Sequence, residues 1–92
     1  MIEKDKLIIM KKKMEDIADI LYKGNTEQGI AAIKDILPYL SMLATDMENE
    51  ELQGQFIEEV LSPLLQAMED KDGTMMADII TFELIHMVEK MG

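Results

Sequence analysis

Residues 68–86, MEDKDGTMMADIITFELIH, contain two spacings of residue types that bind metal ions in proteins. The first surrounds Gly73 and resembles an EF-hand calcium loop, which needs oxygen ligands at positions 1, 3 and 5, glycine at 6 and an acid at 12. With Gly73 at position 6, Met68 and Ile79 fall at positions 1 and 12, where neither can bind calcium. A loop that starts two residues later fails at positions 6 and 12. The sequence therefore predicts no calcium site here.

The same residues are better suited to the start of a helix. Gly73 is expected to supply the turn, and Thr74 is expected to be the N-cap of the final helix. Asp78 then lies in the first turn, where a carboxylate favours the positive end of the helix dipole. We therefore expect a helix over about residues 75–90.

The second spacing joins Glu83 and His86, which are three residues apart. Di-iron four-helix bundles use this spacing on two helices, together with two further glutamates. The chain has a single histidine, so only a homodimer could supply two such motifs, with Glu58 or Glu59 recruited as well. The alternative hypothesis is therefore a homodimeric carboxylate/His metal protein using Glu83, His86 and Glu59. Otherwise His86 hydrogen-bonds Glu83 or water.

Catalytic patterns are absent from the sequence. There is no cysteine to act as a nucleophile or thiolate ligand. His86 would have to activate Ser41 or Ser62, and neither serine lies in a nucleophile-elbow motif. No glycine-rich phosphate-binding loop occurs. We expect no enzyme activity, no catalytic residues and no cofactor.

Composition restricts the partners further. The 92 residues carry a net charge of −10, and no arginine is present. Six lysines and five acids lie up to Lys23, whereas three lysines and fourteen acids follow it. This balance argues against nucleic acid, which is bound through lysine and arginine. No apolar run approaches the roughly 20 residues that span a bilayer, and the start does not read as a signal peptide. We therefore expect a cytoplasmic protein with no membrane partner.

Apolar residues recur every three or four positions, which indicates amphipathic helices. The first two helices have the seams Leu7, Met10, Met14, Ile17 and Leu21, widened by Ile9 and Ile20, and then Ile30, Ile33, Leu37, Leu40, Ala44 and Met47. Gly24 is expected to end the first helix, and Asn25 to cap the second in a capping box with Gln28. Residues 46–51 are the expected loop to the third helix.

The third and fourth helices complete the pattern, with seams at Leu52, Phe56, Ile57, Val60, Leu61, Leu64 and Met68, and at Met76, Ile80, Leu84, Met87 and Met91. No strand pattern occurs. The sequence predicts one all-α domain over residues 1–92, an antiparallel four-helix bundle. Pro38 and Pro63 lie inside helical patterns, so we expect kinks or breaks near them.

The final helix is apolar around much of its circumference, which favours contact on more than one side. Met75, Ile79, Phe82 and Ile85 are the expected partner-binding residues. The chain has ten methionines, a residue type that suits both core gaps and adaptable binding surfaces. We expect a homodimer, or a module that binds a client helix.

Residues 68–84 also resemble a segment of small bacterial helical proteins, some of them associated with flagellar functions. The residues that this chain shares with the segment are Lys71, Asp72, Met75, Met76, Ala77, Asp78, Ile79, Ile80, Phe82, Glu83 and Leu84. The resemblance implies an accessory or chaperone-like binding role rather than catalysis. It names no catalytic residues.

Overall fold

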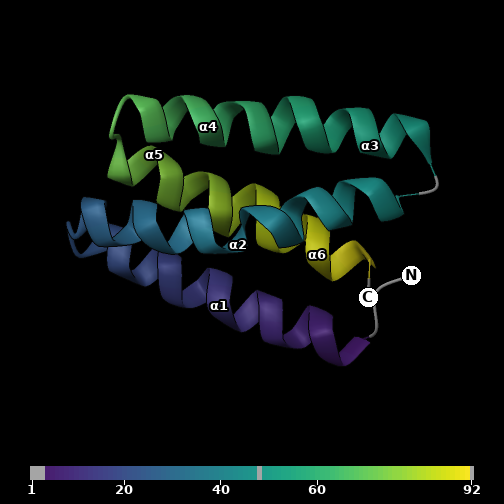
Figure 1. Ribbon diagram of the computed structural model, residues 1–92, viewed down its shortest axis with the longest axis horizontal. Helices are drawn as coiled ribbons and strands as arrows, with labels where there is room; N and C mark the ends of the chain where they lie inside the picture. The colour runs from purple at the N-terminus through teal and green to yellow at the C-terminus, as the bar shows by residue number, and fades with distance from the viewer. Residues whose placement is uncertain (1–3, 48, 92) are drawn as a thin grey trace.

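Over the residues that the structure describes, the chain forms four helices, which run alternately up and down (Figure 1). The computed structural model describes residues 4–47 and 49–91, apart from the side chain of Met91. The first and second helices are α1 and α2, and the third and fourth each contain a central π-helical segment. The bounds are α1 Lys4–Tyr22, α2 Thr26–Asp46, α3 Glu50–Phe56, η1 Ile57–Leu61, α4 Ser62–Glu69, α5 Gly73–Asp78, η2 Ile79–Leu84 and α6 Ile85–Met91. The all-α four-helix prediction is confirmed, and the described residues include no strand.

The four helices do not contact one another equally. α1 packs against α5, η2 and α6 on one side and against α2 on the other. The third helix packs along the fourth, through the pairs α4–α5 and η1–η2. α2 has its main contact with α1 and meets the third helix chiefly at α3, where Gln53 Nε2 donates a hydrogen bond to the Ala44 carbonyl oxygen at 2.6 Å. α2 is therefore held mostly by α1.

One hydrophobic core joins all four helices. Its largest fully buried side chains come from every helix and include Phe56, Met14, Ile33, Leu40, Leu64, Met76 and Ile80. The predicted methionine seams hold, since Met10, Met14, Met47, Met76 and Met87 are buried and Met68 is half-buried. The prediction for the Met91 side chain lies outside the described residues. Methionine thus serves mainly as core material here.

The helix starts differ from the expected caps. Asn25 precedes α2, but its side chain makes no capping bond because its backbone (φ −85°, ψ 62°) lies outside the extended region of most N-caps. Asp72, not Thr74, caps α5, and its carboxylate accepts from the Met75 N–H at 3.0 Å. Lys71, with φ +54°, is the left-handed residue of the turn before α5, so the expectation that Gly73 supplies this turn is wrong; Gly73 is the first residue of α5.

The connection between α2 and α3 is shorter than the predicted loop at 46–51. α3 begins at Glu50 because Asn49 caps it, accepting hydrogen bonds from the Glu51 and Leu52 N–H groups at 2.9 and 3.2 Å. Residue 48, within that loop, lies outside the described residues. Two of the acids expected in the loop thus form the first turn of α3, where they favour its dipole.

The two prolines have different effects. α2 stays α-helical through Pro38, so the expected break does not occur there. Before Pro63 the helix widens into η1, in which the Ser62 N–H bonds to the Ile57 carbonyl oxygen, five residues back. A proline ring collides with the carbonyl four residues earlier and donates no hydrogen bond, and a wider turn relieves that crowding. Pro63 thus coincides with a distortion and not with a break.

Candidate functional site

Only part of the partner surface predicted on the fourth helix is exposed in the structure. Phe82 and Met75 are exposed, at 67% and 43%, but Ile79 and Ile85 are buried in the core and do not belong to that surface. The expected face assumed ideal α-helical periodicity. The turns of η2 hold more residues than α-helical turns, which rotates the residues that follow and brings Ile85 inward. Two exposed side chains therefore remain of the four.

The predicted metal ligands do not form a site within one chain. Glu59, Glu83 and His86 are all exposed. No three His, Asp or Glu side chains in the described part of the chain lie close enough together to hold a metal ion. The metal hypothesis requires two copies of the Glu83/His86 motif, one from each subunit of a homodimer, and the structure of a single chain does not test it.

A groove lies between the N-terminal half of α1 and the C-terminal half of α2. It has a volume of about 310 Å³ and is lined by Lys6, Ile9, Met10, Lys13, Met14, Ile36, Tyr39 and Met42. These two halves are adjacent because α1 and α2 are antiparallel, and they lie away from the turn at Gly24 (Figure 1). The groove is therefore at the open end of the α1–α2 pair.

The opposite end of this pair is closed. Gly29 of α2 approaches α1 so closely that a Cβ atom there would overlap the Leu21 side chain. Leu21 is itself buried, so it has little room to move. Beside this contact, the Tyr22 hydroxyl donates a hydrogen bond to Asp78 Oδ1 at 2.6 Å, and that bond raises the pKa of Tyr22. Tyr22 thereby ties the C-terminal end of α1 to α5.

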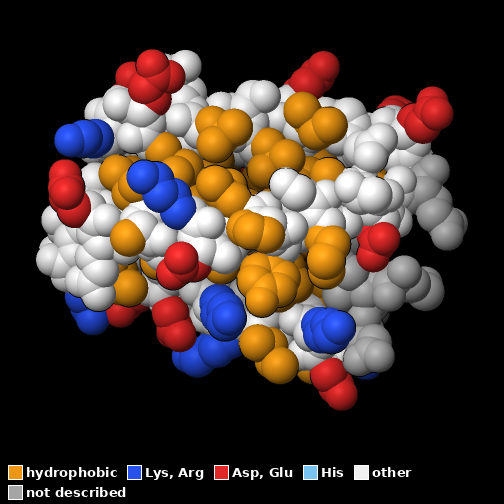
Figure 2. Space-filling model, viewed as in Figure 1, with side chains coloured by type: hydrophobic (Ala, Val, Ile, Leu, Met, Phe, Trp, Pro, Cys, Tyr) orange, Lys and Arg blue, Asp and Glu red, His pale blue; other side chains and the backbone are white. Residues whose placement is uncertain are grey.

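The groove has a buried floor and an exposed apolar rim. Met10, Met14 and Ile36 belong to the core, whereas Ile9 and Met42 on the rim are 57% and 46% exposed. Hydrophobic side chains gather with lysines beside them in the lower half of Figure 2, where α1 and α2 lie in Figure 1. A concave, mostly apolar lining with a few polar groups makes this groove the candidate functional site.

The charges at the groove are both positive. Lys6 and Lys13 line it, and no acidic residue of the described chain does. The Lys13 ammonium lies 5.6 Å from the centroid of the Tyr39 ring, a cation–π distance. Within residues 4–47 and 49–91, neither lysine makes an ion pair.

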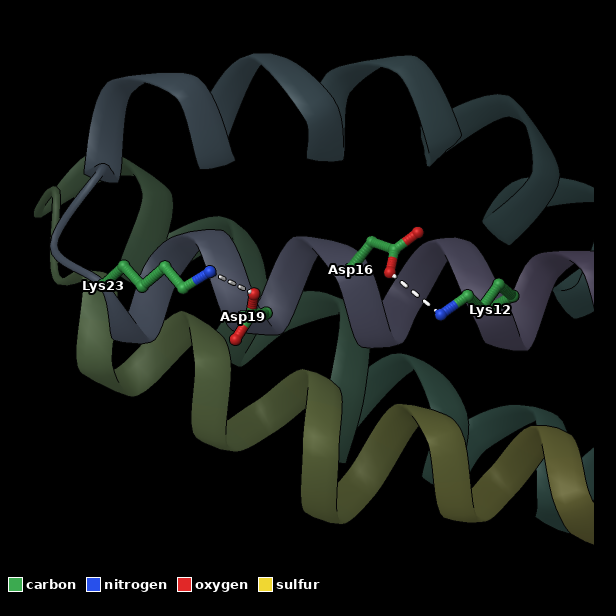
Figure 3. Close-up of polar contacts among 4 residues, drawn as sticks. All are labelled: Lys12, Asp16, Asp19 and Lys23. Atoms are coloured by element: carbon green, nitrogen blue, oxygen red, sulfur yellow. Dashed lines mark ion pairs between the residues drawn. The ribbon is translucent and has the colours of Figure 1, made fainter.

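The other lysines near the middle and end of α1 are already paired. Lys12 contacts Asp16 at 3.4 Å, and Lys23 contacts Asp19 at 2.8 Å (Figure 3). Lys11 reaches Glu89 of α6 at 3.0 Å. Among the described residues Lys6 and Lys13 have no such partner, a property they share with Lys4, Lys34 and Lys90, but of these five lysines only Lys6 and Lys13 line the groove.

Sequence reasoning did not identify this groove. It assigned Ile9 to a widened seam, and the exposed fraction of Ile9 shows that this residue lies outside the core. The available signal was the seven-residue spacing of Lys6 and Lys13, which brackets Ile9 on one side of a helix. Residues Ile36, Tyr39 and Met42 gave no separate signal, because their role depends on how α2 is placed against α1.

Comparisons with known proteins add a family and no function. No helix in the described ranges is both long and apolar enough to cross a membrane. A comparison with curated proteins finds no match, and neither does a comparison with solved structures. The chain belongs to the family described as a domain of unknown function, DUF8042, whose model matches residues 4–92.

Proposed function

We propose that this protein is a small, non-catalytic interaction module, accessory or chaperone-like in type, that buries an apolar helix surface against a client helix or a second copy of itself. The binding mode is helix-in-groove recognition, in which an amphipathic helix lays its apolar face into a hydrophobic groove. This proposal includes the role implied by the resemblance of residues 68–84.

The exposed apolar rim of the α1–α2 groove carries the proposal. Ile9, Tyr39 and Met42 remain accessible beside a buried floor that the core holds in place. A chain this short buries only roughly 60–65% of its unfolded surface, so covering further apolar area adds to its stability. Methionine on the rim and floor allows the groove to adapt to the side chains that enter it.

The acidic exterior supports a cytoplasmic, freely diffusing module. Fourteen acids lie beyond Lys23, and a net charge of −10 keeps copies apart except where specific contacts form. Binding at the groove is then selective, because most of the remaining surface repels other acidic proteins.

The test compares two surfaces by placing a charge on each. The double variant Ile9→Glu/Met42→Glu adds carboxylates at the groove, and Phe82→Glu adds one on the fourth helix. Each wild-type side chain is largely exposed, so the fold should tolerate the change. Sedimentation velocity and affinity capture from the native host provide the measurements.

We expect the groove variant to lose self-association or captured partners, and Phe82→Glu to retain them. Equal losses in both variants would assign binding to the fourth helix as well. A monomer whose captured proteins are the same for wild type and groove variant would contradict the proposal.

A further inference from the structure

We infer that the α1–α2 groove selects acidic amphipathic helices, with Lys6 and Lys13 each pairing with a carboxylate of the partner. This inference rests on the proposed function, because it names the chemical class of the helix that the groove binds. It differs from the expectation set by net charge alone, which would favour a basic partner for an acidic protein.

The spacing of the two lysines determines the spacing of the acidic residues that they can bind on a partner helix. Lys6 and Lys13 are seven residues apart, which is about two helical turns or roughly 10 Å along the axis of α1. Residues seven apart lie on the same side of a helix, and Ile9 and Met10 lie between the two lysines. A partner helix along the groove therefore matches them with two acids about two turns apart and apolar residues between.

Within the described residues, the two groove lysines differ from three other lysines in or directly after α1 in their lack of an acidic partner. Lys11, Lys12 and Lys23 have acidic partners at 3.0, 3.4 and 2.8 Å. Lys6 and Lys13 have none within ion-pair distance in the part of the chain that the structure describes, and Lys13 lies over Tyr39 instead. A partner carboxylate would therefore gain an interaction without displacing an existing ion pair.

Salt screening makes the local charges decisive. At physiological ionic strength the Debye length is about 8 Å, so distant acids on the surface are largely screened. A carboxylate beside Lys6 or Lys13 interacts within that length, on a rim already surrounded by apolar groups. Charge pairs of this kind fix register and partner choice more than raw affinity. A basic helix would place two like charges against the groove lysines.

The experiment uses the full chain and three synthetic helical peptides of about 18 residues, long enough to form helix on binding. All three carry leucine at positions i, i+3, i+4 and i+7. The flanking positions, two turns apart, carry Glu in one peptide, Gln in the second and Lys in the third. Fluorescence anisotropy of labelled peptide measures the affinity, and circular dichroism confirms that every variant is folded.

We expect the Glu peptide to bind about tenfold more tightly than the Gln peptide, and the Lys peptide to bind most weakly. The double variant Lys6→Glu/Lys13→Glu should reverse the order of the Glu and Lys peptides. The control is Lys12→Glu, which makes the same kind of charge reversal on the same helix. Lys12 pairs with Asp16 and does not line the groove, so this variant should preserve the order of the peptides. Raising the salt concentration should reduce the preference.

Each contrary outcome is distinguishable. Equal affinity for the Glu and Gln peptides, with both weakened by Ile9→Glu, would overturn charge selection and leave the proposed function standing. Binding of none of the peptides would overturn the inference, and it would overturn the proposed function as well only if the protein is also a monomer whose captured proteins are the same for wild type and the Ile9→Glu/Met42→Glu variant. Lysine-dependent binding to phosphatidylglycerol vesicles, without peptide binding, would overturn the inference in favour of an anionic surface.

Discussion

The two ends of the α1–α2 pair differ in the size of the side chains between the helices. At the closed end, Gly29 has no side chain, and the backbone of α2 comes against Leu21. At the open end, Ile9, Tyr39 and Met42 are large and line a space of about 310 Å³ without filling it. The same two helices thus form core at one end and an accessible groove at the other. Substitutions at each end should therefore affect different properties.

Removal of a buried side chain at the closed end should have the largest effect on stability. Leu21→Ala leaves a cavity beside Gly29 and should lower the free energy of unfolding by about 2–5 kcal/mol. Ile9→Ala at the open end removes an exposed side chain and should change it by no more than about 0.5 kcal/mol. Urea denaturation measures both. Similar losses for the two variants would mean that the open end is packed as tightly as the closed end.

Filling the closed end should be the next largest effect. Gly29→Ala places a methyl group onto the Leu21 side chain and should cost about 1–3 kcal/mol through overpacking. The control is Gly54→Ala in α3, where a Cβ meets no atom within 4 Å, and this change should stabilise the protein by about 0.5–1 kcal/mol. Chemical denaturation of the two variants gives opposite signs if the difference is steric. A stabilising Gly29→Ala would show that the helices can separate there at no cost.

A smaller effect is expected on the rim of the groove. Tyr39→Leu keeps apolar area and removes the ring beneath Lys13, which at an exposed site should cost about 0.5–1 kcal/mol. Denaturation of Tyr39→Leu, Lys13→Gln and the double variant measures the coupling between the two residues. Fully additive losses would show that the lysine and the ring do not interact.

The smallest effect concerns pH at the closed end. The bond from the Tyr22 hydroxyl to Asp78 favours the neutral phenol and raises the pKa of Tyr22 above its ordinary 10.0. A group whose pKa is raised on folding contributes stability below its unfolded pKa and loses it as pH rises through the folded value. The stability difference between wild type and Tyr22→Phe should therefore be constant near neutral pH and shrink above about pH 10. A stability difference between the two proteins that stays constant up to about pH 11 would contradict this account.

Much of the fold followed from the sequence because it depends on local periodicity. The 3/4 spacing of Met10, Met14 and Ile17 places them on one side of any α-helix, and these residues are buried. Helix ends were less predictable, since Asp72 and Thr74 are both good N-caps and the left-handed turn at Lys71 decides between them. Local rules rank the candidates, but the path of the chain selects one.

The candidate site could not be predicted in the same way. Ile85 is buried because η2 alters the periodicity before it, and no proline marks that segment. The groove requires residues about 30 positions apart along the chain, such as Ile9 and Tyr39, to face each other across two helices that close at Gly29. The way two helices pack decides which residues face each other, and the periodicity of a single helix does not predict it.

The close contact at Gly29 holds the N-terminal part of α2 against α1. Tyr39 lies ten residues along α2 from Gly29, or about 15 Å at 1.5 Å per residue. A rotation of α2 by about 4° around that contact therefore moves Tyr39 by roughly 1 Å, which is enough to alter side-chain fit. The fit of side chains at the groove thus depends on how closely α2 packs against Leu21 at Gly29, ten residues from Tyr39.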